Sequence, residues 1–211
     1  TQLAQGIPVP VRTSFEHSYR LTPEQLEEAI TDKTRVLILC SPSNPTGSCY
    51  SKQDLEGLAE VLRRYPNISI ISDEIYEYIV FDEEHISLLN VAPDLKDRVA
   101  LINGFSKGFA MTGWRLGYLA GPEELVKAVG KIQSQETSAP SSISQAAGFA
   151  AYSGTLDEVL VMRASFKARR DFMVEQLNSI EGVSCFSPGG AFYVFPDISS
   201  YLGSVTPSGT P

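Results

Sequence analysis

The chain has 211 residues, of which 43% are hydrophobic and 20% are charged, and its formal net charge is −8. This composition is typical of a soluble globular protein with one sizeable core and part of a second. The negative charge disfavours nucleic acids and anionic membranes as partners, because both bind basic surfaces, and no apolar run approaches the ~20 residues of a membrane span.

The first two thirds of the sequence alternate helix signals with strand signals. Thr22 is a predicted helix N-cap, with Pro23 in the first turn and Gln25 placed to close a capping box. The apolar run at 34–40 is continuous, which predicts a parallel strand covered on both faces. The further predicted elements are a helix that opens at Ser51, strands at 68–71, 99–102 and 116–120, and helices at 122–133 and 141–152.

The last part of the sequence predicts one long helix over 156–180, followed by strands at 183–186 and 191–195 around the turn at 187–190. A helical stripe in the long helix is predicted to be core; its members are Val159, Met162, Phe166, Met173, Leu177 and Ile180. We expect a large domain over 1–154, a linking helix with the start of a smaller α+β domain over 155–199, and a loose tail over 200–211.

This alternation favours an α/β fold with a doubly wound, mostly parallel sheet. Such sheets bind ligands beyond the carboxyl ends of their strands. Asn44 follows the first strand, Asp73 the second and Lys107 the third. We therefore expect these polar groups to converge on one rim of the sheet.

The segment 104–117, GFSKGFAMTGWRLG, is the strongest chemical signal in the chain. A lysine just past a strand can form a Schiff base with an aldehyde cofactor, and Arg115 or Ser106 can hold a phosphate. Together these groups indicate pyridoxal phosphate chemistry at Lys107. The plainer alternatives are a solvated surface lysine and, for Arg115, a surface ion pair.

Three other residues fit the same ligand. The Asp73 carboxylate can pair with a protonated pyridine nitrogen, although a helix cap is an alternative role. The Tyr76 hydroxyl can bond the ring oxygen of the cofactor, or it can belong to a core tyrosine. Asn44, in the turn sequence SNPTG at 43–47, can face the ring oxygen and a substrate carboxylate, or belong to an ordinary loop.

These motifs, in this order and at these separations, resemble the class I aminotransferases of the pyridoxal phosphate fold-type I superfamily. The resemblance covers the chain to about residue 199 and implies a three-layer α/β/α large domain. It also implies that Lys107 binds the cofactor covalently and moves the proton. Asp73, Tyr76, Asn44, Ser106 and Arg115 would hold the cofactor, with Asn44 also near the substrate carboxylate.

The sequence around the motifs is most similar to the aspartate aminotransferase subgroup, in particular to plastid enzymes of plants and algae that accept aspartate and prephenate. The expected reaction is transamination between an amino acid, aspartate or glutamate, and a 2-oxo acid, which would be 2-oxoglutarate, oxaloacetate or prephenate. The resemblance further implies a homodimer. A lyase or synthase on the same scaffold and a non-catalytic fragment remain alternatives.

Some family features are absent from the sequence. Gly104 stands where some members have a serine that binds phosphate. The glycine-rich phosphate loop should precede Thr1, and the arginine that grips the substrate carboxylate should follow Pro211. We therefore expect a fragment that lacks both ends and its targeting region.

The cysteines and histidines give weaker information. The three cysteines contain no C-x-x-C pair, which indicates a reducing compartment, here the plastid or the cytoplasm. His17 and His85 lie in unrelated contexts, so local roles are favoured for both and no metal site is predicted.

Overall fold

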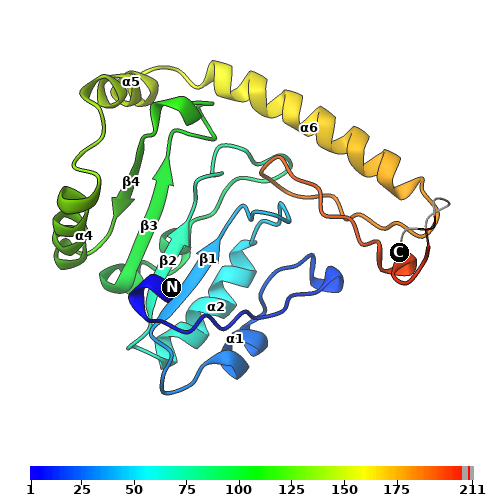
Figure 1. Ribbon diagram of the computed structural model, residues 1–211, viewed down its shortest axis with the longest axis horizontal. Coiled ribbons are helices and arrows are strands. Elements are labelled where there is room, and N and C mark those ends of the chain that lie inside the picture. The colour runs from blue at the N-terminus through cyan, green and yellow to red at the C-terminus, as the bar shows by residue number, and fades with distance from the viewer. Residues whose placement is uncertain (206–208, 210–211) are drawn as a thin grey trace.

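The computed structural model describes residues 1–205 and residue 209 (Figure 1). In chain order its helices and strands are α1 (Pro23–Ala29), β1 (Val36–Cys40), α2 (Lys52–Arg64), β2 (Ser69–Asp73), α3 (Leu88–Val91), β3 (Val99–Gly104), β4 (Gly117–Ala120), α4 (Glu123–Glu136), α5 (Ser142–Ser153) and α6 (Asp157–Asn178). Short 3₁₀ turns lie at Gln2–Ala4, Phe15–His17, Pro93–Arg98, Thr112–Trp114 and Ser199–Tyr201. None of the helices in this described part combines the length and the apolar character needed to cross a membrane.

The helix starts predicted at Thr22 and Ser51 both form as capping boxes. At α1, the Gln25 backbone N–H donates to Thr22 Oγ1 at 3.3 Å, and the Thr22 N–H donates to Gln25 Oε1 at 3.1 Å. At α2, Ser51 and Asp54 exchange the same pair of bonds. These side chains satisfy N–H groups that the first helical turn leaves without partners.

The strands form one sheet in the order β1-β2-β3-β4 (Figure 1). β1, β2 and β3 run parallel, and β4 runs antiparallel to β3. The mostly parallel α/β architecture is therefore confirmed. Because the three parallel strands point the same way, their carboxyl ends meet at one edge, as the positions of Asn44, Asp73 and Lys107 predicted.

Helices cover one face of this sheet. α1, α2 and α3 pack against it through a cluster that includes Leu55, Leu58, Ile70 and Val99. The expectation that both faces of β1 are covered is wrong for this chain. Val36 is 50% exposed and Ile38 is 61% exposed, whereas Leu39, which points to the opposite face, is buried.

The helix α6 runs past the sheet and extends beyond it, and the chain then returns beside it (Figure 1). The prediction that its apolar stripe is core holds only near the start. Val159 is buried, but Met173 and Ile180 are 42% and 49% exposed. The far half of the helix has too little of the described chain beside it to cover these side chains.

The strands predicted at 183–186 and 191–195 do not form, and this expectation is wrong. The described residues contain only isolated bridges there, between Ser184 and Asp197 and between Val80 and Gly190. Gly190 bridges to the loop after β2 and not to a neighbouring strand, and Ala191 has a left-handed backbone, with φ 58°. A residue in that conformation cannot continue an extended strand.

The domain division predicted at 154/155 falls between α5 and α6. The residues beyond it are not separate from the rest, since Met162, Phe166 and Ala191 pack with Tyr76 and Ile79. The division itself stays a prediction. The loose tail predicted for 200–211 lies partly outside the described residues, at 206–208 and 210–211.

Candidate functional site

The carboxyl ends of β1 and β2 are held together by the sheet register. Cys40 lies opposite Asp73, and the Ser41 N–H donates to the Asp73 carbonyl at 3.0 Å. Asn44 is exposed, in the turn that follows β1. The Cys40 thiol, whose pKa is raised mainly by burial, donates to the Pro42 carbonyl at 3.4 Å, two residues before Asn44. The Asn44 turn therefore begins directly at the strand end that lies beside Asp73.

Asp73 is the last residue of β2 and is half-buried. One carboxylate oxygen, Oδ1, accepts the Ile75 backbone N–H at 3.2 Å, which is a local turn bond. No helix of the described chain begins at this residue, so the helix cap considered for Asp73 does not form. Among the described residues, no Lys, Arg or His nitrogen lies within 4.0 Å of the carboxylate. A negative charge at the rim is therefore left without an ionic partner, and it can pair with a cationic ligand.

Lys107 lies beyond the end of β3 and is half-buried. Its Nζ is 5.7 Å from the ring centroid of Tyr76 and 5.5 Å from that of Phe192. Within residues 1–205, no Asp or Glu oxygen lies within 4.0 Å of this amine. The amine thus rests on aromatic faces and is free of a salt bridge, which differs from a solvated surface lysine.

Ser106 and Arg115 lie in the segment that joins β3 to β4. The ladder between these strands extends past Gly104 and Gly117 to a bond from the Phe105 N–H to the Leu116 carbonyl at 3.3 Å and stops there, because Arg115 has a left-handed backbone, with φ 49°. Ser106 is half-buried, whereas Arg115 is exposed and donates to the Thr112 carbonyl at 2.8 Å. Both residues belong to the same connecting segment as Lys107, and their role as phosphate ligands stays a prediction.

The close packing of β3 on β4 explains why position 104 is a glycine. A Cβ there would lie 2.7 Å from the Gly117 Cα and 2.9 Å from the Leu116 carbonyl oxygen. Both contacts are with backbone, which cannot move aside cheaply. The serine that some family members have at this position is therefore disfavoured by the close β3–β4 approach in this chain.

Tyr76 is buried, and its hydroxyl hydrogen-bonds the Tyr193 hydroxyl at 2.6 Å. Burial, followed by this hydrogen bond, raises the pKa of Tyr76. The phenol therefore stays protonated at neutral pH and can donate to an acceptor. The rim thus combines the Lys107 amine, the Asp73 carboxylate and the Tyr76 phenol.

The sequence as a whole matches the family described as "Aminotransferase class I and II" over residues 1–205. The chain belongs to the class I and II aminotransferases. An aspartate/prephenate aminotransferase of Cereibacter sphaeroides is 49% identical over 208 residues, which cover 98% of this chain and 52% of that protein. A Petunia hybrida bifunctional aspartate aminotransferase and glutamate/aspartate-prephenate aminotransferase is 50% identical over 207 residues, covering 96% of this chain and 43% of that protein.

The solved structures agree with the sequence relatives. A crystal structure of the aspartate aminotransferase from Rhizobium meliloti matches with a TM-score of 0.95 and 47% identity, covering 99% of this chain and 52% of that one. The resemblance inferred from the motifs is therefore confirmed, and so is the fold class. The aminotransferase chain spans about half the length of these relatives.

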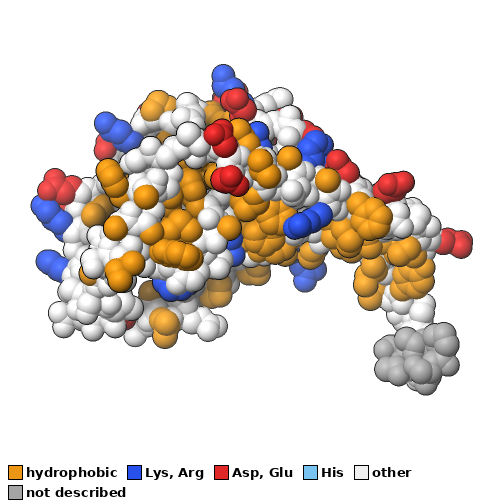
Figure 2. Space-filling view, turned by 90° about the horizontal axis from the view of Figure 1, so that it is seen from above, with side chains coloured by type: hydrophobic (Ala, Val, Ile, Leu, Met, Phe, Trp, Pro, Cys, Tyr) orange, Lys and Arg blue, Asp and Glu red, His pale blue; other side chains and the backbone are white. Residues whose placement is uncertain are grey.

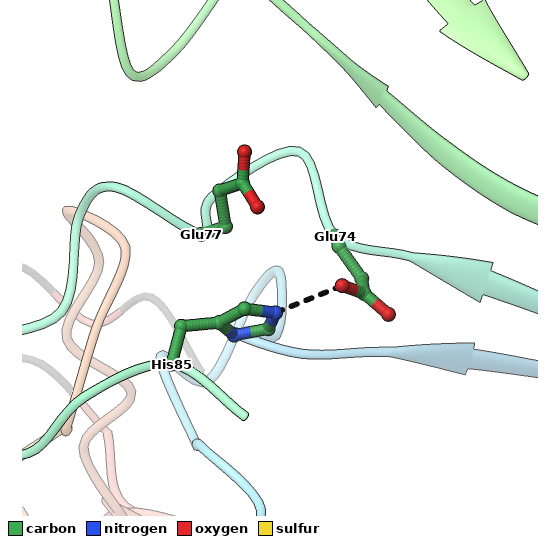
Figure 3. A group of neighbouring side chains, drawn as sticks. All are labelled: Glu74, Glu77 and His85. Atoms are coloured by element: carbon green, nitrogen blue, oxygen red, sulfur yellow. Dashed lines mark hydrogen bonds and ion pairs between the residues drawn. The ribbon is translucent and has the colours of Figure 1, made fainter. Parts of the chain in front are cut away.

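A second group of polar side chains lies beside the rim of this aminotransferase chain. Glu74, Glu77 and His85 point toward one another (Figure 3), with potential ligand atoms within 4.8 Å. Burial would raise the pKa of Glu74, but hydrogen bonds from His85, Ser87 and Ser72 together lower it. Because the Glu74 carboxylate already has these partners, the group is explained by local hydrogen bonding, in line with the local role expected for His85.

Two aromatic residues at the rim were missed by the sequence reasoning. Phe192 and Tyr193 approach the Lys107 amine and the Tyr76 hydroxyl, but the pattern around them was interpreted only as a strand. The available signal was a pair of aromatics directly after the Pro-Gly-Gly turn that ends at Gly190. A turn of this kind can bring residues from far along the chain to a sheet edge.

Proposed function

We propose that the protein containing this chain transfers an amino group between an amino acid and a 2-oxo acid, with pyridoxal 5′-phosphate bound at the rim. The observation that carries the proposal is that two groups of opposite charge lie at neighbouring strand ends and that neither has an ionic partner in the described chain. Within the described residues, the half-buried amine of Lys107 and the carboxylate of Asp73 lack salt bridges at neighbouring strand ends. Such groups fit an aldehyde cofactor with a cationic ring.

The cofactor, when bound, supplies an electron sink for the bonds at the amino acid's α-carbon. In the proposal, Lys107 holds it covalently between turnovers and, once released, carries the proton to and from the α-carbon. Asp73 keeps the ring nitrogen protonated. Arg115 and Ser106 bind the phosphate, of which Arg115 offers the planar fork suited to its oxygens.

The remaining two residues act on the ring oxygen. Tyr76 is positioned to donate its hydroxyl proton, and Asn44 offers a side-chain amide from the turn after β1. Asn44 is also proposed to contact the substrate α-carboxylate. Hydrogen bonds to a developing negative charge at these positions favour the reaction over mere binding.

The names of the relatives support a specific choice of substrates. Those from Cereibacter sphaeroides and Petunia hybrida are aspartate and prephenate aminotransferases. We therefore propose aspartate or glutamate as amino donor and 2-oxoglutarate, oxaloacetate or prephenate as acceptor, in preference to a lyase or synthase reaction. The compartment, plastid or cytoplasm, stays a prediction.

We also propose that the whole protein is a homodimer. Hydrophobic side chains gather along the side of the molecule that carries α5 and α6 (Figure 2). On α5, Ile143 and Phe149 are 77% and 75% exposed. Apolar surface of this extent supports coverage by the remainder of the protein and by a second copy.

The function is tested with Lys107→Ala in the full-length protein loaded with pyridoxal phosphate. With aspartate and 2-oxoglutarate, we expect wild type to form oxaloacetate and glutamate. The variant should lose at least ~10²–10⁴ in turnover, because both the covalent link and the proton carrier are gone. Borohydride should trap the cofactor on Lys107 in wild type, as read by peptide mass.

The matched control is Lys52→Ala, which removes an exposed lysine on α2 that pairs with Glu56 at 3.7 Å. Its turnover should equal that of wild type. Near-normal activity of Lys107→Ala, or borohydride labelling at another lysine, would contradict the proposal. Decarboxylated or eliminated products from aspartate would instead assign a lyase.

A further inference from the structure

The segment from Gly189 to Tyr193 is fastened to the loops that follow β1 and β2. The Phe81 N–H donates to the Gly189 carbonyl at 2.9 Å, and the Ala191 N–H donates to the Ile79 carbonyl at 2.8 Å. On the other side, the Gly190 N–H donates to the Gly47 carbonyl at 3.0 Å. These three backbone bonds tie a distant part of the chain to the two loops that carry Asn44 and Tyr76.

Ala191 turns the chain sharply at this point. It is fully buried and has φ 58°, a conformation that a non-glycine residue adopts only at an energetic disadvantage. The residues that follow the turn are Phe192 and Tyr193. A strained backbone held in place by packing and hydrogen bonds is typical of positions where side-chain direction matters.

The turn directs both aromatics to the candidate site. The Phe192 ring lies 5.5 Å from the Lys107 amine and packs edge-on against the Tyr76 ring, with centroids 5.5 Å apart. The Phe166 ring from α6 stacks on its other side at 5.3 Å. Tyr193 then reaches the Tyr76 hydroxyl with its own hydroxyl at 2.6 Å.

We propose that Tyr193 is a positioning residue of the cofactor site, which acts through Tyr76. Either hydroxyl can be the donor in this bond. When Tyr76 donates to the ring oxygen of the bound cofactor, Tyr193 takes the donor role toward Tyr76, fixes its hydroxyl and strengthens that donation. Linked hydrogen bonds polarise one another in this way. The inference rests on the proposed function, because it assigns a role within that same site.

Tyr193 is the residue that contacts the Tyr76 hydroxyl directly in the described structure. The other titratable groups that act on the Tyr76 hydroxyl are Cys40 and Asp73, and the Lys107 amine lies over its ring. None of these three is hydrogen-bonded to the Tyr76 hydroxyl in the described structure. The Tyr193 bond is thus the direct protein contact that sets its direction.

The test is a pH titration of the visible absorbance of the Lys107–cofactor imine in the full-length protein. A weaker hydrogen bond to the ring oxygen leaves more negative charge there, which holds the imine proton more tightly. Tyr193→Phe should therefore raise the midpoint of the titration by roughly half a pH unit, while the ring and its packing are retained. Tyr76→Phe should raise it by at least as much.

The matched control is Tyr201→Phe, which removes a hydroxyl bonded to the Glu181 carbonyl and not to a residue of this site. Its midpoint should equal that of wild type. If Tyr193→Phe also stays within about 0.1 unit of wild type while Tyr76→Phe shifts, the role of Tyr193 is wrong and the proposed function stands. If wild type gives no borohydride-trapped imine at all, the proposed function itself fails.

Discussion

Gly47 lies where the turn that carries Asn44 packs closely against the segment that carries Tyr193. Its φ is +72°, and a Cβ built on it would lie 2.5 Å from the Pro188 Cβ and 2.8 Å from the Gly190 carbonyl oxygen. The Gly47 carbonyl also accepts the Gly190 N–H. The turn with Asn44 and the turn with Tyr193 can meet only because this position has no side chain.

We expect Gly47→Ala to lower the free energy of unfolding by about 1–3 kcal/mol, because it combines a disfavoured backbone conformation with a clash against backbone atoms. Gly113→Ala is the matched control. Gly113 has a negative φ, and no atom lies within 4 Å of the place that an added methyl group would take, so the change should stay within about 0.5 kcal/mol. Denaturant unfolding of both variants measures this, and equal values would contradict the packing argument.

The site residues that the sequence predicted share one property, which is a place just after an apolar run. Asn44, Asp73 and Lys107 could be located because strand ends in an α/β sheet are the positions where polar groups meet. Phe192 and Tyr193 could not be located in this way. Their approach depends on the positive φ of Ala191 and on backbone bonds to residues more than 100 positions earlier, which no local pattern contains.

At the scale of elements, the clearest sequence signals were the helix caps. The Ser51 Oγ accepts the Asp54 backbone N–H at 3.2 Å, and the Asp54 carboxylate accepts the Ser51 N–H at 2.8 Å. The capped helix, α2, carries Leu55, Leu58 and Leu62 into the main core. Its first turn therefore sets the position of the layer on which the sheet rests.

Ser51→Ala should lower the free energy of unfolding by about 1 kcal/mol, the typical loss for a helix N-cap. Ser165→Ala, at an exposed position inside α6, removes the same hydroxyl where it caps nothing and should be neutral or slightly stabilising. The comparison is made by thermal or urea unfolding. A loss in Ser165→Ala as large as in Ser51→Ala would show that capping is not the cause.

The elements predicted after the long helix failed for a physical reason. Apolar runs at 183–186 and 191–195 look like strands, but a strand needs a neighbour along its whole length. The returning chain meets the loop after β2 at Val80, and Ser184 meets Asp197, each as a single bridge. Local composition predicts the tendency to extend, whereas the partner is a property of the tertiary structure.

At the scale of the whole molecule, Arg170 connects the long helix to the rest. Its guanidinium donates to Asp82 at 2.6 Å and to the Pro188 carbonyl at 2.8 Å, and it lies 4.9 Å from the centroid of the Phe81 ring. Its side chain is only 6% exposed. One buried cation thus joins α6, the loop after β2 and the turn before Ala191, which are the segments that assemble around Tyr76.

The stability that the contact between Arg170 and Asp82 contributes should depend on pH. Hydrogen bonds from Arg170 and Lys167 lower the pKa of Asp82 from 3.8 to about 2. A depressed carboxyl pKa stabilises the folded state above the ordinary pKa, and this contribution is lost as the pH falls through the folded-state value of about 2. Asp82→Asn should therefore lower the unfolding midpoint at about pH 5, and its difference from wild type should be much smaller at about pH 2 and vanish below it.

The Asp82 side chain is 54% exposed, so solvent screening keeps this effect small. Asp157→Asn, at the exposed first turn of α6, serves as a control without an ion pair to Arg170. A difference between Asp82→Asn and wild type that is the same at both pH values would contradict the assignment.

The parallel register of β1, β2 and β3 has a consequence for how such proteins can change during evolution. Successive residues of a strand point to opposite faces, so the insertion or deletion of one codon within 69–73 would turn the Asp73 carboxylate from the open face of the sheet to the helix-covered one. Length variation in this lineage should therefore accumulate in the connecting loops, while each of the three strands keeps its residue count.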